Sequence, residues 1–306
     1  MVGRLLLGAG TVILLFVAYQ LWGTGIAESH SQAVLRTKFD HELDRVHREA
    51  GSTTTVAPKS GSPDPAPTTA APGDGQPVGL IQIPRIGLDK VIVEGTSTTD
   101  LRQGPGHYQG TPLPGQAGTA AIAGHRTTYG APFYNLNELA DGDPVVITTT
   151  QGVFTYKVMR TVVVPCGDSN CNDPADQAVI APSLTPELTL TTCNPRFSSS
   201  SRLVVQATLA SARVTAPVSP TPTTTVPPHH ISAAAVAANL AGSQGDWVPA
   251  LWWGAAVLGT GLLVWLVARR RRGGTRALFY GTGTVGVLVV LFFFFGAVSP
   301  LLPASF

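Results

Sequence analysis

Apolar residues form long uncharged blocks at both ends of the chain and only short runs between them. The blocks extend from Leu5 to Trp22, from Val248 to Ala268 and from Ala277 to Leu302. Each is close to the ~20 residues that a helix needs to cross a bilayer, so the pattern predicts three membrane spans. The first block also fits the apolar core of a signal peptide, but its length and the single preceding Arg4 favour an uncleaved anchor.

Basic residues predict how these spans are oriented. Arg269–Arg272 and Arg276 lie between the second and third blocks, and Lys and Arg near span ends are retained in the cytoplasm. We therefore expect this short loop inside, and the segment from about Glu28 to Trp247 and the terminal Phe306 outside. Because both flanks of the basic cluster are apolar, its expected partner is the lipid bilayer and not a nucleic acid.

Two linker-like segments separate a central region from the spans. Residues 51–76 and 213–245 are rich in Ser, Thr, Pro, Ala and Gly, a composition that behaves as an extended linker. Before the first linker, Leu35, Phe39 and other apolar residues recur at helical spacing, as in a stalk helix. We divide the chain into a membrane anchor at 1–27, an extracytoplasmic stalk and linker at 28–76, a folded catalytic domain at 77–211, a second linker at 212–246 and two further spans with their basic loop at 247–306.

The central domain shows short apolar runs interrupted by Gly, Pro and Asp, which is typical of an all-β domain. The candidate strands are Leu80–Ile86, Val91–Glu94, Thr119–Ala123, Val145–Thr149, Phe154–Val164, Val179–Ala181, Leu188–Thr192 and Leu203–Leu209. Such a set favours a closed barrel or a sandwich, since closure removes exposed sheet edges. Short helical turns are expected at residues 99–103 and 134–139. The 8 Lys or Arg and 10 Asp or Glu of the domain give a net charge of 8 − 10 = −2, which favours no polyanionic partner.

The cysteine count leaves one thiol that cannot pair within the chain. The chain has three, and outside the reducing cytosol two of them can form a disulfide. Alternation along residues 188–193 places Leu188 and Leu190 on the core face and Cys193 on the other face, at the strand end. The same alternation along the next strand places Arg202 on its non-core face. The alternative is that Cys193 is a small buried hydrophobic residue.

A cysteine nucleophile needs a group that takes its proton, because a thiol with a pKa of about 8.5 is mostly protonated at neutral pH. Histidine is the usual partner, and the domain sequence contains only His107 and His125. His125 lies just after the apolar run that ends at Ala123 and leads into a polar loop, so it resembles Cys193 in position. His107 follows Gly-Pro-Gly and is predicted as a turn residue. A structural role for His125 stays open at this point.

Taken together, these residues resemble the signature of the sortase family. That signature is a Thr-Leu-x-Thr-Cys strand with an upstream His and a downstream Arg, and it is matched by Thr189 to Cys193, Gly124-His125 and Arg202. The stretches Ala123 to Gly130 and Cys193 to Phe197 resemble the actinobacterial class E group in particular. The resemblance covers roughly residues 79–210 and implies an eight-stranded sortase-type β-barrel with short helices. The two-cysteine segment at 165–182 and the C-terminal spans depart from the family pattern.

The resemblance also implies a reaction. Cys193 would be the nucleophile, His125 the acid and base, and Arg202, not the rival cation Arg196, the oxyanion stabiliser. The enzyme would cut a C-terminal sorting motif of a surface protein, of the Leu-Ala-x-Thr-Gly or Leu-Pro-x-Thr-Gly type, after Thr through a thioester. It would then transfer the protein to an amine of cell-wall peptidoglycan or of a pilin. No cofactor and no metal is expected.

Substrate contacts are expected in the loop after His125. Tyr129 offers a flat ring with a hydroxyl four residues beyond His125, and the resemblance to class E sortases implies that it favours Leu-Ala-x-Thr-Gly. Thr128 and Thr192 complete the candidate substrate-binding set. The alternative for Tyr129 is a packing role in the loop.

Two other functions fit the same residues. A cysteine peptidase that releases the acyl group to water would use the same nucleophile and base, so the acceptor distinguishes it from a transpeptidase. A noncatalytic, membrane-tethered binding module facing the wall would contain an unreactive Cys193, so thiol reactivity distinguishes it from both enzymes.

We predict a disulfide between Cys166 and Cys171, which lie five positions apart in a loop rich in Gly, Asp, Asn and Pro outside the cytosol. The closed loop is short, so its effect on stability should be modest. Peptide mapping without reduction should recover the Cys166–Cys171 bridge. A bridge from Cys193 to either residue would contradict both this pairing and the assignment of the nucleophile.

Overall fold

The computed structural model describes residues 2–50, 65–166, 183–214, 247–270 and 274–299. These residues fall into two compact units. In the described part of the chain, the larger unit contains residues 25–50, 65–166 and 183–214, and the smaller contains residues 2–24, 247–270 and 274–299. The predicted strand Val179–Ala181 lies outside the described residues.

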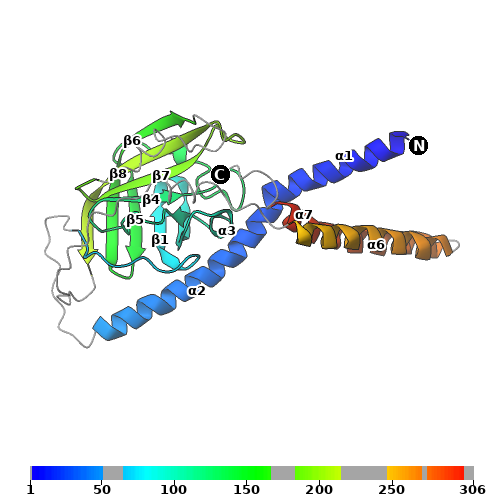
Figure 1. Cartoon of the computed structure of the whole chain (residues 1–306), viewed down its shortest axis with the longest axis horizontal. Helices are drawn as coiled ribbons and strands as arrows, with labels where there is room; N and C mark the ends of the chain where they lie inside the picture. Colours follow the sequence, from blue (N-terminus) through cyan, green and yellow to red (C-terminus); the bar gives the residue numbers. More distant parts are fainter. Residues whose placement is uncertain (1, 51–64, 167–182, 215–246, 271–273, 300–306) are drawn as a thin grey trace. The chain divides into compact units, whose positions relative to one another are not determined.

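The larger unit is a closed β-barrel whose strands follow the order β1-β2-β3-β4-β7-β8-β6-β5 (Figure 1). The strands are β1 Pro77–Ile83, β2 Leu88–Glu94, β3 Gly106–His107, β4 Thr119–Ala123, β5 Pro144–Thr149, β6 Gly152–Pro165, β7 Glu187–Asn194 and β8 Ser201–Val214. Neighbouring strands are antiparallel, except that β2 pairs with β3 and β4 pairs with β7 in parallel. The eight-stranded barrel predicted from the sequence is therefore confirmed.

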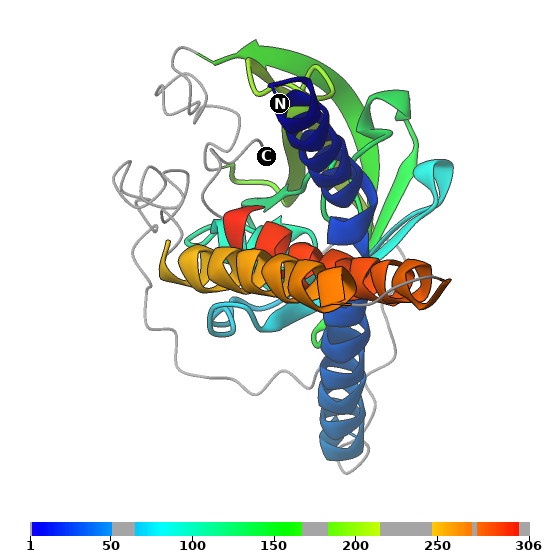
Figure 2. The same cartoon turned by 90° about the vertical axis from the view of Figure 1, so that its right-hand side faces the viewer.

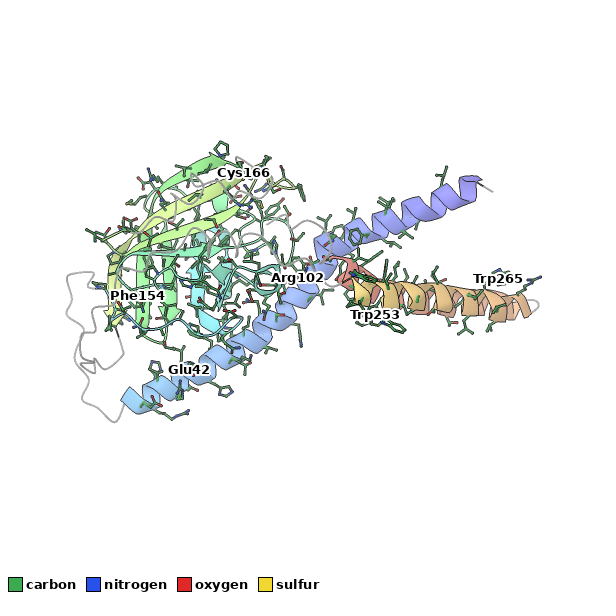
Figure 3. The ribbon with its side chains drawn as sticks, in the orientation of Figure 1. Glu42, Arg102, Phe154, Cys166, Trp253 and Trp265 are labelled. Carbon is green, nitrogen blue, oxygen red and sulfur yellow. The ribbon has the colours of Figure 1, made fainter. Side chains whose placement is uncertain are left out.

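The barrel interior is filled by alternate side chains of its strands, because successive residues of a strand point to opposite faces. Leu188 and Leu190 of β7 and Leu203 and Val205 of β8 all belong to one buried apolar cluster, as the alternation predicted. Phe154 of β6, labelled in Figure 3, is fully buried in the same cluster. The opposite faces of β7 and β8 are thereby left to carry polar side chains.

The structure corrects the sequence-based prediction for His107. Instead of forming a turn, His107 belongs to β3, which pairs with β2 and with β4. Its ring is fully buried, and its Nδ1 lies 2.8 Å from Oε2 of Glu94. The segment was misassigned because two strand residues among glycines and a proline show no alternation, so only their partners define them as a strand.

Three short helices connect the strands, namely η2 Pro84–Ile86, α3 Thr98–Leu101 and η3 Leu136–Glu138. Helices α3 and η3 overlap the two predicted helical turns. Helix η2 instead replaces the end of the predicted strand Leu80–Ile86, because Pro84 has no amide hydrogen to continue the ladder. Helix α3 begins with a capping box, in which Ser97 and Asp100 bind each other's backbone amides. This cap defines the turn that leads from β2 towards β3.

Helix α2, Thr24–Ala50, packs against the barrel, although the sequence suggested only a stalk. Leu35 and Phe39 are both buried, and Leu35 forms a cluster with Val91 and Val93 of β2. The apolar stripe predicted at helical spacing is thus partly a packing surface. Figure 1 shows α2 passing along the barrel.

The smaller unit consists of α1 Val2–Ala18, the short π-helix η1 Tyr19–Gly23, α6 Val248–Arg270 and α7 Gly274–Val298. Helices α6 and α7 lie side by side (Figures 1 and 2). The rings of Trp253 and Phe293 stack between them, with their centroids 4.9 Å apart. Among the described residues, two helices are long and apolar enough to cross a membrane, at Leu6–Glu49 and Val248–Val267. The third predicted span falls on α7, in which Thr282–Val298 is an apolar stretch shorter than those of the other two helices, and its predicted end lies outside the described residues.

Candidate active site

Strands β7 and β8 bring Cys193 and Arg202 together. The two residues are direct partners in the antiparallel register of these strands, and Nη1 of Arg202 donates a hydrogen bond of 3.1 Å to Sγ of Cys193. Strand β7 ends at Asn194 because Pro195 has no amide hydrogen to continue the ladder. The strand pairing alone therefore places a guanidinium on the thiol.

His125 leaves the sheet beside Cys193. Strand β4 runs parallel to β7, with Ala123 opposite Thr191, and the amide of Gly124 donates to the carbonyl of Thr191 at 3.1 Å. The hydroxyl of Thr192 donates to the carbonyl of Gly124 at 2.7 Å. These contacts hold the residue before His125 against the residue before Cys193, so the two candidate catalytic residues emerge from the same edge of adjacent strands.

Arg126 is a site residue to which the sequence analysis assigned no role. Its Nη1 donates to the carbonyl oxygen of Cys193 at 2.9 Å and to Oδ1 of Asn194 at 2.7 Å, and its Nη2 donates to Oδ1 of Asn137 at 2.9 Å. Arg126 is 5% exposed. It ties the loop that carries His125 to the end of β7. Its one sequence signal was its place directly after His125.

The thiol of Cys193 is buried, with 4% of its surface exposed, as the alternative of a small buried residue would also require. Burial raises the pKa of the Cys193 thiol above its ordinary value, and the positive charges of Arg202 and Arg126 oppose this rise. Burial also lowers the pKa of the Arg126 guanidinium, with a further contribution from the nearby Arg196. The resting site therefore favours a protonated thiol flanked by two arginines.

A small pocket lies on the non-core face of the sheet next to Arg202. It is lined by Thr96, Leu101, Tyr108, Ala123, Gly124, Thr191, Thr192 and Arg202. The hydroxyls of Tyr108 and Thr191 are 3.0 Å apart, and burial raises the pKa of the Tyr108 phenol. Tyr108 was not recognised from the sequence, because its place in the pocket depends on the pairing of β3 with β4.

The three predicted substrate-binding residues occupy different surroundings. Thr192 lines the pocket and is buried, with its hydroxyl bound to Gly124. Tyr129 is half-buried, and its ring centroid lies 5.0 Å from that of His125 at an angle of 35°. Thr128 is half-buried, and its carbonyl accepts a hydrogen bond from the amide of Ala131. Only Thr192 of these three lines the pocket.

The rival cation Arg196 is bound to the neighbouring loop. Its Cζ lies 4.0 Å from the ring centroid of Tyr134, and its Nη2 donates to Oδ1 of Asn135 at 3.2 Å. Arg202 is the arginine that contacts the sulfur of Cys193 in the described part of the chain. The geometry therefore favours Arg202 over Arg196 as the cation at the nucleophile.

The remaining cysteines bear on the predicted disulfide. Cys193 is a free thiol, whereas Cys166, which follows β6 and is labelled in Figure 3, is disulfide-bonded. Cys171 lies outside the described residues, so the predicted pairing with it stays a prediction. Among the described residues, no cluster of three or more His, Cys, Asp or Glu side chains is arranged to hold a metal ion.

Comparison with known proteins matches this region to one family. The family profile described as a sortase domain matches residues 81–210. The chain is 32% identical over 213 residues to Sortase SrtE1 of Streptomyces coelicolor, which covers 67% of this chain and 55% of that protein. It is 33% identical over 162 residues to Sortase D of Bacillus subtilis, covering 52% of this chain and 76% of that protein.

Two solved structures are similar to this chain. The structure of sortase E from Streptomyces avermitilis is 38% identical, covers 47% of this chain and 93% of that one, and has a TM-score of 0.40. A Sortase D5 transpeptidase of Clostridium perfringens is 26% identical, covers 59% of this chain and 98% of that one, and has a TM-score of 0.46. The match to the first relative, SrtE1, spans little more than half of its length, 55%.

We predict that Arg202→Met raises the pKa of Cys193 further, because it removes the largest charge that opposes the effect of burial. The midpoint of the pH dependence of Cys193 alkylation by iodoacetamide should therefore move to higher pH. Arg160→Met is a matched control, since Arg160 is exposed on β6 and bonded to Gln206. An unchanged or lowered midpoint in Arg202→Met would show that the guanidinium does not stabilise the thiolate.

Proposed function

The chain belongs to the sortase family, and from this premise we propose that it is a membrane-anchored cysteine transpeptidase of the class E type. Its substrate would be a surface protein with a C-terminal sorting motif of the Leu-Ala-x-Thr-Gly or Leu-Pro-x-Thr-Gly type. The enzyme would cut after Thr, hold the protein as a thioester on Cys193 and pass it to an amine of peptidoglycan or of a pilin.

One observation carries the proposal, namely the pairing of a free buried thiol with an arginine across two strands. Nη1 of Arg202 lies 3.1 Å from Sγ of Cys193, close to where the oxygen of an attacked carbonyl would develop its charge. A fixed cation at that place stabilises the transition state more than the ground state. Arg202 suits this role because its guanidinium stays protonated.

The proposed steps assign the proton to His125. The Cys193 thiol gives its proton to the imidazole, and the sulfur attacks the carbonyl carbon of the Thr-Gly bond, so that the electron pair moves onto oxygen beside Arg202. Collapse of this intermediate breaks the C–N bond, and His125 returns the proton to the departing glycine amine. The acceptor amine then loses a proton to His125, attacks the thioester and releases the Cys193 sulfur.

Burial of the Cys193 thiol supports a mechanism in which the thiolate forms only after the substrate binds. The raised pKa of Cys193 means that little free thiolate is present before the substrate binds, and the reaction begins with transfer of a proton to an adjacent base. A protonated, buried thiol is also less exposed to oxidants outside the cell. The site therefore fits an enzyme that works in a non-reducing compartment.

The surroundings of the catalytic domain complete the proposal. Two helices have the length and apolarity of membrane spans, and the arginines at 269–272 and 276 would hold their loop in the cytoplasm. We propose a multi-pass protein whose catalytic domain, residues 77–211, faces the outside. This orientation would place Cys193 where surface proteins and wall precursors meet.

We predict that the full chain in detergent micelles joins a sorting peptide to an amine nucleophile, and that Cys193→Ala abolishes both the acyl-enzyme and the product. Arg202→Lys should lose roughly 10²-fold in kcat, the scale of a lost oxyanion donor, with KM changed much less. Mass spectrometry of a small peptide panel, with steady-state kinetics, measures both effects.

Three outcomes would contradict this proposal. A raised KM with kcat nearly intact in Arg202→Lys would make Arg202 an anchor for the peptide. Acid product alone at saturating amine would make the protein a hydrolytic peptidase. Absence of any acyl adduct on the wild-type chain would favour a noncatalytic binding module.

We further predict that Tyr129 favours Leu-Ala-x-Thr-Gly over Leu-Pro-x-Thr-Gly. Its ring lies beside His125, so a side chain there can contact the residue that precedes the variable position of the motif. Tyr129→Leu should reduce the ratio of kcat/KM for the two peptides, while Tyr134→Leu, on the same connection between β4 and β5, should leave that ratio unchanged. If Tyr129→Leu also leaves the ratio unchanged, Tyr129 has a packing role only.

A further inference from the structure

Helix α2 contributes buried polar contacts to the barrel that an ordinary stalk would not need. Gln32 is 9% exposed. Its Oε1 accepts from the amide of Val91 at 2.7 Å, and its Nε2 donates to the carbonyls of Val91 at 3.0 Å and Gln103 at 2.8 Å. Gln32 thus satisfies part of the free edge of β2 and joins it to the loop at residues 102–105.

One turn earlier, Glu28 reaches the loop that follows His125. Its carboxylate is 1% exposed and forms an ion pair with Nζ of Lys90 at 2.8 Å. A Cβ atom at Gly130 would lie 2.4 Å from Oε2 of Glu28, so the carboxylate packs directly on the backbone of this glycine. Gly130 therefore has no room for a side chain, and its φ of +72° also favours glycine.

The two loops held by α2 meet at Tyr129. Cζ of Arg102 lies 5.5 Å from the ring centroid of Tyr129, and the ring of Tyr129 lies 5.0 Å from that of His125. Arg102, labelled in Figure 3, lies next to α2, consistent with the bond from Gln32 to the adjacent Gln103. A continuous series of contacts therefore leads from α2 to the candidate acid and base.

The loop that carries Tyr129 needs external support. Tyr129 and Ala131, on either side of Gly130, have φ values of 49° and 44°, in the left-handed region that residues with a side chain rarely adopt. Such backbone persists only where the surroundings hold it. The side chain packed on the middle residue is Glu28.

We propose that Glu28, held by Lys90, is a positioning residue that keeps the loop at 126–131 in place and thereby orients His125 for proton transfer. This inference rests on the transpeptidase function proposed above. The first turns of α2 would then belong to the catalytic unit, although Glu28 lies 97 residues before His125 in the chain, 125 − 28 = 97.

Stability alone does not account for this ion pair. Burial raises the pKa of the Glu28 carboxyl, against the effect of Lys90, so part of the attraction is offset by lost hydration. Such pairs can often be replaced as a whole by apolar residues without loss of stability, whereas removal of one partner is costly when the other charge stays buried. Here the side chain of Lys90 is 25% exposed and can turn to solvent when Glu28 is neutralised. If Glu28 only stabilised the fold, Glu28→Gln would have little effect on kcat. If Glu28 positions the loop, Glu28→Gln lowers kcat.

The test uses the full chain in detergent micelles and compares Glu28→Gln with Arg36→Gln. Arg36 lies two turns further along α2 and forms an exposed ion pair with Asp89 at 2.5 Å, so it controls for charge loss on the same helix. Glu28→Gln should lower kcat roughly tenfold, the effect of a small displacement of a catalytic group. KM, the melting temperature and the alkylation rate of Cys193 should stay close to wild type, because β7 and β8 hold the thiol.

A second readout does not depend on activity. Hydrogen exchange followed by mass spectrometry should show faster exchange in the peptide that covers residues 126–131 for Glu28→Gln and unchanged exchange for Arg36→Gln. Glu28→Asp, which keeps the charge but withdraws it from Gly130, should show the same effects in smaller measure. It also serves as the test if Glu28→Gln does not fold.

Either of two results would overturn the positioning role. One is a Glu28 variant with unchanged kcat and unchanged exchange in this loop. The other is a loss of kcat that Arg36→Gln shares or that only follows a fall in melting temperature. A wild-type chain without transfer activity would refute the proposed function instead, and the exchange measurement would still decide whether Glu28 holds the loop.

Discussion

The antiparallel pairing of β7 with β8 is the constraint on which the site depends. It places Cys193 directly opposite Arg202 and leaves a 3.1 Å hydrogen bond between guanidinium and sulfur. Because a strand alternates its side chains, the same pairing directs Leu190 and Val205 into the barrel. A shift of one residue would therefore misplace the core and the candidate nucleophile together, so the hydrophobic core protects the register of the site.

Two arginines oppose the rise in pKa that burial causes in the Cys193 thiol. Burial disfavours the thiolate, while Arg202 at the sulfur and Arg126 at the carbonyl of Cys193 favour it. These opposing effects act on different steps. In the proposed reaction the protonated thiol is the resting form, and the nearby positive charges become most effective when negative charge develops. Arg126 also fixes the loop of His125 to the strand end of Cys193, so one side chain links both candidate catalytic residues.

The edge of the site is held by a segment outside the region that matches the family profile, residues 81–210. Glu28 and Gln32 of α2 support the loops that carry Tyr129 and Arg102. Both loops lack a regular ladder of their own, so their conformation depends on such contacts. The helix that follows the first apolar block is therefore joined to the catalytic barrel by packing and by buried polar groups.

Alternation and turn residues in the sequence were sufficient to predict most strands and, with the family resemblance, to name Cys193, His125 and Arg202 as candidate catalytic residues, because strand faces and strand ends are local properties of the chain. The short β3 escaped detection, since two residues carry no period and exist as a strand only through their partners. Arg126 and Glu28 acquire their roles from groups far away in the chain. The sequence by itself thus determined most strands and named the candidate catalytic residues. Only the tertiary structure decided which side chains hold those residues in place, because such contacts join segments whose separation leaves no local pattern.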